Sequence, residues 1–471
     1  MLRRRLAGFL ATAVAATFSA AAVAVEVPVH DPFVAAFVVL GPDGSPVARV
    51  ITTTEGCPSL VVDGAAMAMH SRAAAGTEPL RPTESSLANS KPSAFPVITC
   101  EADVPKGARR AAVEGHDLPL PAPVIRRIVV IGDTGCRLKA TDNAYQACND
   151  PSQYPFAAIA DKAAAWQPDL VVHVGDYLYR ENPCPSGNTG CAGSPWGYGW
   201  DAWNADFFTP AEPLLRAAPW LVVRGNHENC SRAGQGWWRF LDPRPLAIDQ
   251  DCNDPAHDET GDYSDPYGVP IGGDAQIIVL DLAITGDKPI TSPDFRFKDF
   301  QKSYADMDRL AARARTNIVA NHKPILALSG GKIPGELEGG NRGIQSVYRT
   351  LNPWLFPASV DVLLAGHVHV WEQLSFSSPH PSQFVTGFSG TLEPRVPLPA
   401  IPPASAAAGP DAVIAAFSSW VDGYGFMTME RAGPTAWKVK VWSSAGKVVN
   451  RCRIVGRQSW CRYPQVHTER P

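Results

Sequence analysis

The sequence predicts an α/β protein with a β-rich N-terminal part, and three observations lead to this prediction. Five short apolar runs each end in polar residues. These runs span residues 128–131, 170–174, 221–223, 318–320 and 362–365. A segment of helical character at 299–314 lies between two of them. Before residue 125, short apolar runs such as 33–40 are broken by turn signals such as Pro42-Asp43-Gly44. Continuous apolar strands are expected where both faces of a sheet are covered.

The composition is that of a folded, loop-rich protein. The chain has 471 residues, of which 45% are hydrophobic and 19% are charged, so there is enough apolar material for at least one full core. Its 44 proline and 39 glycine residues indicate many loops. Lysine and arginine number 42 against 46 acidic residues, so the charge balance predicts no nucleic-acid-binding patch. Composition therefore excludes a disordered or fibrous chain.

The N-terminus has the pattern of a secretory signal peptide. Residues 3–5 are arginines, an apolar stretch runs from 6 to 23, and Ala22-Val23-Ala24 has the form of a cleavage site. An uncleaved membrane anchor is the competing interpretation, because the stretch approaches the ~18 residues that span a bilayer. Its richness in alanine and threonine favours cleavage. We therefore predict a signal peptide at 1–24, no stable membrane anchor, and a periplasmic or secreted mature protein.

Ten cysteines fit this export prediction, because an even number in an oxidising compartment suggests disulfide bonds. Sequence alone leaves their connectivity open, but they fall naturally into five consecutive pairs. The pairs would be 57 with 100, 136 with 148, 184 with 191, 230 with 252, and 452 with 461. A zinc site is the alternative, and the lack of any Cys-x2-Cys pair in the sequence argues against it.

A proline-rich segment at 118–124 marks a linker. We expect residues 25–125 to form a small β-rich N-terminal domain. Residues 126–471 would form the second, larger domain, which includes strands near the C-terminus.

Polar side chains that can bind metal ions follow the apolar runs. In order, they are Asp133, Asp176, Asn226, His227, His322, His367 and His369. Because functional groups gather beyond the carboxyl ends of strands in an open α/β sheet, we expect them near one edge. Carboxylates, a carboxamide and imidazoles suit Fe, Mn or Zn, and seven such groups exceed the needs of one tetrahedral ion. Two ions about 3.5–4 Å apart would use them for in-line displacement at phosphorus. The residues alone therefore predict a binuclear hydrolase.

These side chains belong to five short motifs. The motifs are Asp133-Thr134-Gly135, Gly175-Asp176-Tyr177-Leu178-Tyr179, Gly225-Asn226-His227-Glu228, Val319-Ala320-Asn321-His322 and Gly366-His367-Val368-His369. In this order they resemble the motifs of the calcineurin-like metallophosphoesterases, over about residues 126–445. The chain is most similar to the purple acid phosphatase branch, for two reasons. Gly135 stands where most members carry a histidine ligand, and Tyr179 completes a Gly-Asp-x-x-Tyr motif.

The resemblance implies a site for two metal ions. The first, Fe(III), would be bound by Asp133, Asp176, Tyr179 and His369. The second, which could be Fe, Mn or Zn, would be bound by Asp176, Asn226, His322 and His367. Asp176 would bridge the two ions, and the Tyr179 phenolate would replace the missing imidazole.

The resemblance also implies a fold and a reaction. The metallophosphoesterase fold has two mixed β-sheets sandwiched between helices, and strands near 424–429 and 437–442 would complete the second sheet. His227 would contact the phosphate and protonate the leaving group. A metal-bound hydroxide would be the nucleophile, because coordination lowers the pKa of water by several units. No covalent phosphoenzyme is then required.

Substrate contacts are marked less clearly in the sequence. Arg180, Arg224 and Arg232 lie beside the motifs, and a guanidinium pairs well with phosphate oxygens. Ordinary salt bridges with nearby acidic residues explain these arginines equally well. Aromatic residues are concentrated between 181 and 220, where they would either wall a pocket beside the metals or pack the insert against the protein body. Packing is the favoured interpretation.

Two departures from the purple acid phosphatase pattern bear on the substrate. Trp371-Glu372-Gln373 follows the fifth motif in place of an aromatic residue, Glu and Arg, and no histidine occurs between His322 and His367. Phosphate must then be bound by other groups. We expect an exported, acid phosphatase-like hydrolase of small phosphate monoesters. The alternatives are a phosphodiesterase or nucleotidase that uses Mn or Zn, and a secreted binding protein without catalysis. The presence of all the family's ligand positions argues against the last.

Overall fold

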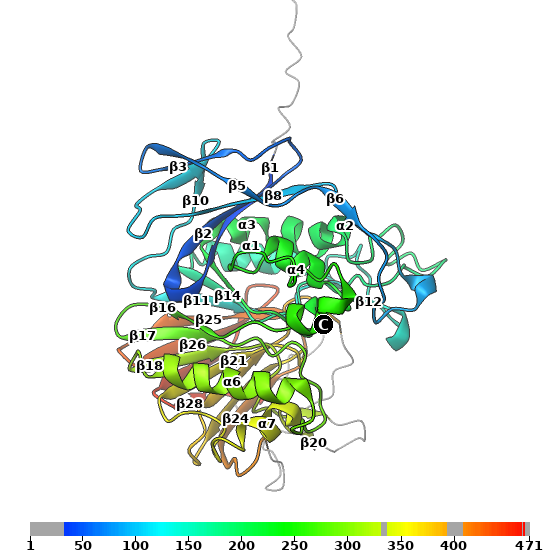
Figure 1. Cartoon of the computed structure of the whole chain (residues 1–471). Helices are drawn as coiled ribbons and strands as arrows, with labels where there is room; N and C mark the ends of the chain where they lie inside the picture. The colour runs from blue at the N-terminus through cyan, green and yellow to red at the C-terminus, as the bar shows by residue number, and fades with distance from the viewer. Residues whose placement is uncertain (1–32, 331–336, 393–407, 464, 467–471) are drawn as a thin grey trace, which may run out of the picture. The chain divides into compact units, whose positions relative to one another are not determined.

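Two large β-sheets form the centre of the protein (Figure 1). The computed structural model describes residues 33–330, 337–392, 408–463 and 465–466. The predicted signal peptide at 1–24 lies outside these residues.

The larger sheet contains the strands that precede the first three motifs. Its order is β28 (Gln458–Cys461), β27 (Val448–Val455), β26 (Ala436–Ser443), β25 (Gly425–Arg431), β11 (Arg127–Ile131), β14 (Leu170–His173), β15 (Trp220–Val222), β1 (Phe33–Leu40), β2 (Pro46–Thr52), β8 (Ile98–Asp103) and β5 (His70–Ala73). The central strands β11, β14, β15 and β1 are parallel, and antiparallel strands flank them on both sides. The predicted mixed sheet is therefore confirmed.

The second sheet contains the strands that precede the last two motifs. Its order is β16 (Tyr267–Pro270), β17 (Ala275–Val279), β18 (Thr316–Ala320), β21 (Val360–Ala365), β23 (Ser382–Thr386), β22 (Trp371–Phe376), β24 (Ile414–Trp420) and β29 (Gln465–Val466). Strands β17, β18, β21 and β23 are parallel, and β16 and β22 pair antiparallel with their neighbours. This sheet is also mixed.

Strands from the N-terminal segment extend the larger sheet. β1 pairs in parallel with β15 through Val39 and Trp220, and β2, β8 and β5 continue outward. Smaller sheets pair β10 (His116–Leu118), β9 (Ala111–Val113), β3 (Ser59–Val62) and β4 (Ala65–Ala68), and also β6 (Gly76–Glu78) with β7 (Ser93–Phe95). The β-rich character predicted for residues 25–125 is confirmed where that segment is described. The domain boundary at 125 stays a prediction, and the described residues from Phe33 onward form one compact unit.

Two short two-stranded sheets lie in the connections between the large sheets' strands. They pair β12 (Leu138–Lys139) with β13 (Ala144–Tyr145), and β19 (Ser329–Gly330) with β20 (Leu337–Glu338).

Helices cover the outer faces of both large sheets. They are α1 (Phe156–Ala165), α2 (Trp200–Trp203), α3 (Thr209–Ala217), α4 (Gly234–Phe240), α5 (Asp258–Gly261), α6 (Phe295–Ala311) and α7 (Arg342–Tyr348). The predicted helix at 299–314 corresponds to α6, which begins at an N-cap where the Asp294 carboxylate accepts from the Arg296 N–H. Its buried residues recur at helical spacing, as at Phe300, Tyr304 and Met307. None of the described helices is both long and apolar enough to cross a membrane.

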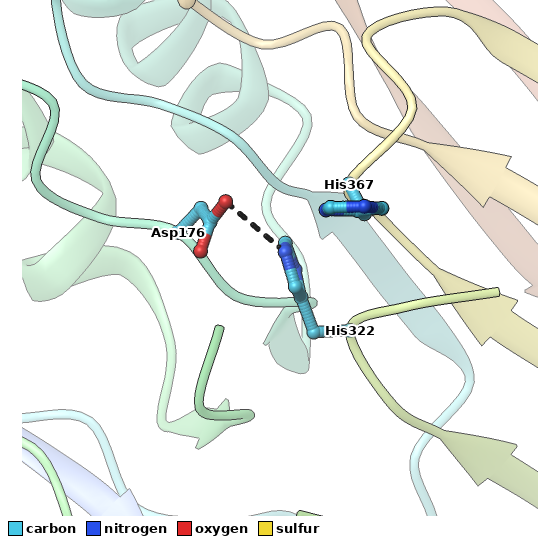
Figure 2. Close-up of side chains that lie close together, drawn as sticks. All are labelled: Asp176, His322 and His367. Atoms are coloured by element: carbon cyan, nitrogen blue, oxygen red, sulfur yellow. Dashed lines mark ion pairs between the residues drawn. The ribbon is translucent and has the colours of Figure 1, made fainter. Parts of the chain in front are cut away.

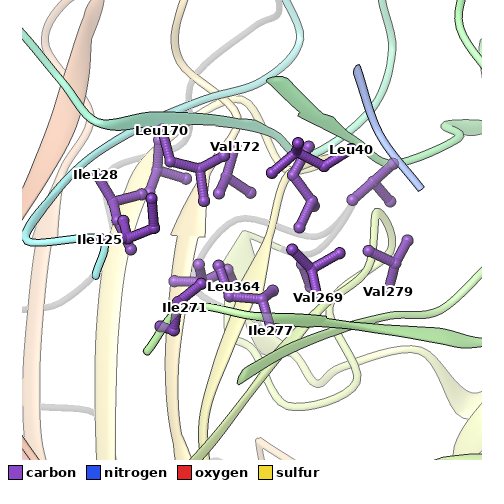
Figure 3. Close-up of a cluster of buried hydrophobic side chains, with 14 of the residues drawn as sticks. Leu40, Ile125, Ile128, Leu170, Val172, Val269, Ile271, Ile277, Val279 and Leu364 are labelled. Atoms are coloured by element: carbon purple, nitrogen blue, oxygen red, sulfur yellow. The ribbon is translucent and has the colours of Figure 1, made fainter. Parts of the chain in front are cut away.

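Alternation along the strands divides the core into layers. Ile128 and Val130 face the second sheet, whereas Val129 and Ile131 face the helices that include α1 and α3. Figure 3 shows the inner layer, where Leu170 and Val172 lie across from Ile277 and Leu364 of the second sheet. A third cluster packs the other face of the second sheet against α6 and α7. The predicted arrangement of two sheets between helices is therefore confirmed.

The C-terminal strands differ from expectation in their sheet. The sequence predicted strands near 424–429 and 437–442 that complete the second sheet, and the structure places them as β25 and β26 of the larger sheet. β25 pairs antiparallel with β11, with Val129 opposite Thr428. This pairing covers the backbone edge that β11 would otherwise expose. β11 and β25 are about 300 residues apart in the chain, so no local pattern in the sequence indicates that they pair.

All five consecutive cysteine pairs are disulfide-bonded. The bonds are Cys57–Cys100, Cys136–Cys148, Cys184–Cys191, Cys230–Cys252 and Cys452–Cys461. Cys136 lies three residues after Asp133, and Cys230 lies four residues after Asn226. Two of the disulfides therefore hold the loops that carry predicted metal ligands.

Candidate metal centre

The carboxyl ends of five parallel strands bring the predicted ligands together. β11, β14 and β15 of the larger sheet lead into Asp133, Asp176 and Asn226. β18 and β21 of the second sheet lead into His322, His367 and His369. The polar residues therefore gather between two sheets, rather than at the edge of one sheet as the pattern alone suggested.

Tyr179 is the meeting point of one half of the cluster. Its hydroxyl oxygen lies 2.8 Å from Asp133 Oδ1, 2.8 Å from Asp176 Oδ2 and 2.9 Å from His369 Nε2. His369 Nε2 is also 3.1 Å from Asp133 Oδ1. All four side chains are buried. The four residues predicted to bind the first ion thus converge on one small volume.

His322 is the meeting point of the other half. Its Nε2 lies 3.0 Å from Asp176 Oδ2 and 3.1 Å from Asn226 Oδ1. Figure 2 shows His322 directed at Asp176 with His367 beside it, and ligand atoms of these three residues lie within 4.8 Å of one another. Asp176 contributes to both halves, as a bridging residue must.

The chemistry of these donors fits a pair of cations. The Val174 carbonyl accepts a hydrogen bond from His322 Nδ1 at 2.8 Å, so in the neutral form that binds a metal the lone pair of the ring lies on Nε2. That lone pair faces two further acceptor oxygens, from Asp176 and Asn226. Buried acceptors crowd together in this way when a positive ion satisfies them. The residues present therefore suit the two ions that the family resemblance implies.

Burial and charge shift the pKa values of the cluster in opposite directions. Burial acts to raise the pKa of Asp176, but His322 and His227 outweigh it, and the net pKa lies well below the usual value. Burial, together with the Asp133 and Asp176 carboxylates, raises the pKa of Tyr179 well above that of a free phenol. Burial acts to lower the pKa of His322, yet the Asp176 carboxylate brings it to about 9. The cluster has excess negative charge, which is the environment a cation requires.

Three of the predicted ligands have left-handed backbone conformations. The φ angles are 56° at Asp133, 60° at Asp176 and 70° at His367. Such conformations cost about 1–3 kcal/mol each in a residue other than glycine. Hydrogen bonds hold them: the Asp133 N–H donates to the Gly175 carbonyl at 3.0 Å, and the His367 N–H donates to Asp133 Oδ2 at 2.9 Å. All three residues lie just beyond the ends of strands, in the loops that carry the predicted ligands.

Gly135 has no room for a side chain. A Cβ built there would lie 2.7 Å from the Tyr179 backbone nitrogen and 2.7 Å from Asp206 Oδ2. Residue 135 is the position at which most members of the resembled superfamily carry a histidine. The close approach excludes an imidazole here and lets Tyr179 take its place beside Asp133.

His227 lies at the side of the cluster. Its backbone N–H donates to Asp176 Oδ1 at 2.8 Å, and its ring lies against the Tyr179 ring with centroids 3.8 Å apart. His227 Nε2 is 3.8 Å from Asp176 Oδ2. Its residual exposure is 7%. The imidazole therefore lies beside the predicted ligands Asp176 and Tyr179.

Each of the three arginines singled out from the sequence has an internal carboxylate partner. Arg180 Nε lies 2.6 Å from Asp206 Oδ1, and Arg224 Nη2 lies 2.6 Å from Asp281 Oδ2. Arg232 pairs with Glu181 and also contacts the His227 ring. All three arginines thus form salt bridges within the protein. Their contact with substrate stays a prediction.

Two buried carboxylates that sequence reasoning missed hold the ligand loops. Glu228 accepts hydrogen bonds from the backbone N–H groups of Asp176 and Tyr177 at 3.0 and 2.8 Å. Asp206 accepts from the Tyr179 N–H at 2.8 Å. Glu228 is part of the third motif, so its position in the sequence could have indicated a role at the site. Asp206 lies in the aromatic insert, where nothing in the sequence distinguishes it.

The aromatic insert packs as core, in agreement with the favoured interpretation. Trp200, Trp203, Phe207 and Phe208 are buried in the cluster between the larger sheet and its helices. They carry Asp206 against the loop that contains Tyr179.

A cavity of about 400 Å³ opens beside His367. Lys323, Asp287, Asn341 and Arg342 are among its lining residues. Lys323 follows the predicted ligand His322 directly, and its ammonium group donates to the Thr285 carbonyl. Trp238 is among the residues that line a second cavity, of about 780 Å³, and none of the predicted ligands lines it.

The fold and this cluster define the class of protein. Residues 126–371, just over half of the chain, match the calcineurin-like phosphoesterase family. The chain belongs to this family, so the resemblance read from its five motifs is confirmed. It is a metal-dependent phosphoesterase, a hydrolytic enzyme that acts on phosphorylated substrates, and its family supports a site for two metal ions.

Solved structures share the fold at low sequence identity. The purple acid phosphatase PPD1 from yellow lupin (Lupinus luteus) seeds is 14% identical, with a TM-score of 0.52 over 92% of this chain and 74% of that one. PhoD is 13% identical, with a TM-score of 0.53 over 92% of each chain. At this identity the likeness shows the fold alone. No curated protein sequence matches the chain significantly.

Proposed function

We propose that this protein is an exported phosphomonoesterase with a binuclear, iron-containing centre. One observation carries the iron assignment: the Tyr179 hydroxyl converges with Asp133, Asp176 and His369 at a position where Gly135 excludes a histidine. A phenolate is a ligand that stabilises Fe(III). The proposed second ion is Fe, Mn or Zn, bound by Asp176, Asn226, His322 and His367.

The two ions would polarise the phosphoryl oxygens and lower the pKa of a water molecule enough to make it a nucleophile near neutral pH. The remaining tasks fall to side chains. His227 lies beside the cluster, within reach of a phosphate ester held there, and is the proposed proton donor to the leaving group. The cavity beside His367 offers space for the organic part of the ester.

The export proposal has its own support. Five disulfide bonds are typical of a protein that folds in an oxidising compartment. N-terminal sequencing of the protein recovered from the periplasm or the medium should begin at Val25. Recovery in the cytoplasm with an intact N-terminus would contradict export.

The iron assignment is tested by metal analysis and visible absorption of the purified full-length protein. We expect two metal ions per chain and a tyrosinate-to-iron absorption band that Tyr179→Phe abolishes. Tyr177→Phe is the matched control, because Tyr177 is equally buried two residues away and its hydroxyl donates to the Val223 carbonyl instead. A band that survives Tyr179→Phe, or the absence of iron, would overturn the assignment.

Parallel assays on a phosphate monoester and a phosphate diester test the substrate class, with Asp176→Ala as the background. Faster monoester hydrolysis supports the proposal. Faster diester or nucleotide hydrolysis with Mn or Zn in the site would replace it with the phosphodiesterase or nucleotidase alternative.

A further inference from the structure

The last three strands of the larger sheet lie in a segment with an unbalanced positive charge. Residues 432–463, which include β26, β27 and β28, contain seven lysine and arginine residues and no acidic residue. The chain as a whole has 42 basic and 46 acidic residues, so this excess is local. A concentration of one charge sign on a protein surface attracts molecules of the opposite sign.

Strand register places four of these cations on one face of the sheet. Lys438 of β26 stands opposite Arg453 of β27, and Lys440 stands opposite Arg451. Between the two lysines, Val439 is buried in the apolar layer that faces the second sheet. Because successive side chains of a strand point to opposite faces, the four cations lie on the outer face.

The two rows of cations continue onto the edge strand. Trp460 of β28 stands opposite Arg453 in the first row. In the second row, the Arg462 backbone N–H donates to the Arg451 carbonyl at 2.9 Å. The outer face of β26, β27 and β28 therefore presents a two-dimensional array of positive charge, which we call the basic face. Its cations are Lys438, Lys440, Arg451, Arg453 and Arg462.

The basic face is open to solvent. Helix α1 packs on the outer side of the sheet as far as β25, the strand before β26 in the chain. Beyond it, Lys438, Arg451, Arg453 and Arg462 are exposed and Lys440 is half-buried. Among the residues that the structure describes, no carboxylate forms an ion pair with any of the five cations. Their charge is thus left for a partner outside the chain.

A large aromatic side chain lies at the rim of the basic face. Trp460 is 47% exposed, and Val455, at the end of β27, is 42% exposed. The Cys452–Cys461 disulfide joins the strands that carry these two residues, at a position where the cysteines stand opposite each other. Tryptophan is enriched where proteins meet the boundary between water and lipid, because its ring is apolar and its N–H is polar.

We propose that the basic face is a docking surface for an anionic lipid bilayer. Charge complementarity carries the proposal, because five cations without a carboxylate partner face solvent together. Lysine and arginine near an anionic leaflet each add to the attraction. An array spread over three strands matches a layer of headgroups, whereas a linear polyanion would need a single row. Trp460 would lie at the level of the headgroups, and binding by such a surface is reversible.

The basic face and the metal centre lie at different places on the sheet. Through β25, the row of Lys438 aligns with Arg127 and the row of Lys440 aligns with Val129 of β11. Asp133 comes later, after β11 has ended at Ile131. Docking through the basic face therefore leaves the predicted ligands free, and the inference does not depend on the proposed phosphomonoesterase activity.

Co-sedimentation with lipid vesicles tests the proposal. The protein used is residues 25–471, which lacks the apolar stretch at 6–23 and keeps the compact unit that begins at Phe33. We expect it to bind vesicles of equal parts phosphatidylcholine and phosphatidylglycerol, and not vesicles of phosphatidylcholine alone. Binding should be lost as salt rises from about 0.01 M to about 1 M, because the Debye length falls from about 30 Å to about 3 Å.

The combined variant Lys438→Gln, Arg451→Gln and Arg453→Gln removes three exposed cations of the basic face. It should weaken binding to the mixed vesicles about 100-fold, because each cation contributes to the attraction. Its kcat on a soluble phosphate ester should equal that of the wild type, since none of the three residues lies at the metal centre. If the combined variant does not fold, Arg453→Gln alone should weaken binding about 5-fold.

The matched control is the combined variant Lys106→Gln, Arg109→Gln and Arg315→Gln. These three cations are exposed and lie outside β26, β27 and β28, so the control loses the same net charge. It should bind the mixed vesicles as the wild type does. A loss equal to that of the basic-face variant would mean that net charge, and not this face, drives binding.

Two further results would overturn the proposal. One is equal binding to neutral and anionic vesicles. The other is tighter binding to polyphosphate or to a single-stranded oligonucleotide than to vesicles, abolished by the basic-face variant, which would assign the face to a linear polyanion. A wild-type protein that binds anionic vesicles but hydrolyses no ester would support this inference and refute the proposed function alone.

Discussion

The layer between the two large sheets and the edge where their strands end belong to the same strands but use opposite kinds of residue. In the layer, residues such as Ile128, Val172 and Ile277 are fully buried and apolar. At the edge, Asp133 and Asp176 bring buried carboxylates and left-handed backbone conformations. The layer is stabilised by the burial of apolar surface, whereas the buried carboxylates at the edge are paired with His322 and His369. The comparison teaches that the same strands supply an apolar scaffold along their length and a polar site at their ends.

Removing the shared carboxylate should have the largest effect. We expect Asp176→Asn to lower kcat/KM by about a thousandfold, or about 4 kcal/mol, because both halves of the cluster lose a charged ligand. The number of bound metal ions should fall as well. Assays and elemental analysis of the purified variant measure both effects.

Asp117→Asn is the control for this change, because Asp117 is an exposed carboxylate paired with Arg110. Near-normal activity and full metal content in Asp176→Asn would contradict the bridging role.

A cavity in the apolar layer should reduce stability and leave the chemistry intact. Ile277 is fully buried on β17, a strand that carries none of the predicted ligands. Ile277→Ala should lower the free energy of unfolding by about 2–5 kcal/mol, because apolar contacts are lost and a cavity remains. Urea unfolding gives that value, and kcat per folded, metal-loaded molecule should stay the same. A large fall in kcat would show that the layer and the edge are not separable.

Glu372 tests what happens to a carboxylate inside a sheet without a cation. It lies on β22, accepts one hydrogen bond, from the Leu328 N–H at 3.0 Å, and burial raises its pKa from 4.5 to about 8. The folded protein keeps the proton to higher pH than the unfolded chain does. This stabilising contribution is complete below about pH 4.5 and is lost as pH rises towards 8.

Glu372→Gln should remove that dependence and stabilise the protein at pH 8 by up to a few kcal/mol. Urea unfolding at a series of pH values, with wild type in parallel, measures the difference. An identical pH dependence in both proteins would mean that Glu372 is not the group responsible.

Much of the fold and the site follows from local patterns. Apolar runs that end near Asp133, Asp176 or His322 predicted strands with ligands at their carboxyl ends. Such a prediction is possible because the apolar strand and the polar residues after it are consecutive in the sequence. The spacing of Cys136 and Cys148 likewise suggested a local disulfide, and the structure confirms it. The helical segment predicted at 299–314 corresponds to α6 at Phe295–Ala311.

Other features were decided only by distant contacts. The sheet joined by β25 depends on pairing with β11, some 300 residues earlier. Nothing near Asp206 in the sequence indicates that it accepts the Tyr179 N–H. Glu181 lies beside a motif, but its contact with His227 depends on how two loops meet.

The sequence by itself determined that this protein is a phosphoesterase of the calcineurin-like family, because its chemistry resides in short motifs attached to strand ends. Tertiary structure decided that the motifs meet between two sheets and that the Tyr179 backbone lies too close to Gly135 for a side chain there. It also decided that the N-terminal segment contacts Asn182 through Ser85 and Arg232 through Glu84. The physical reason is that strand order and close approach between loops depend on contacts across the whole chain, which residue spacing does not encode.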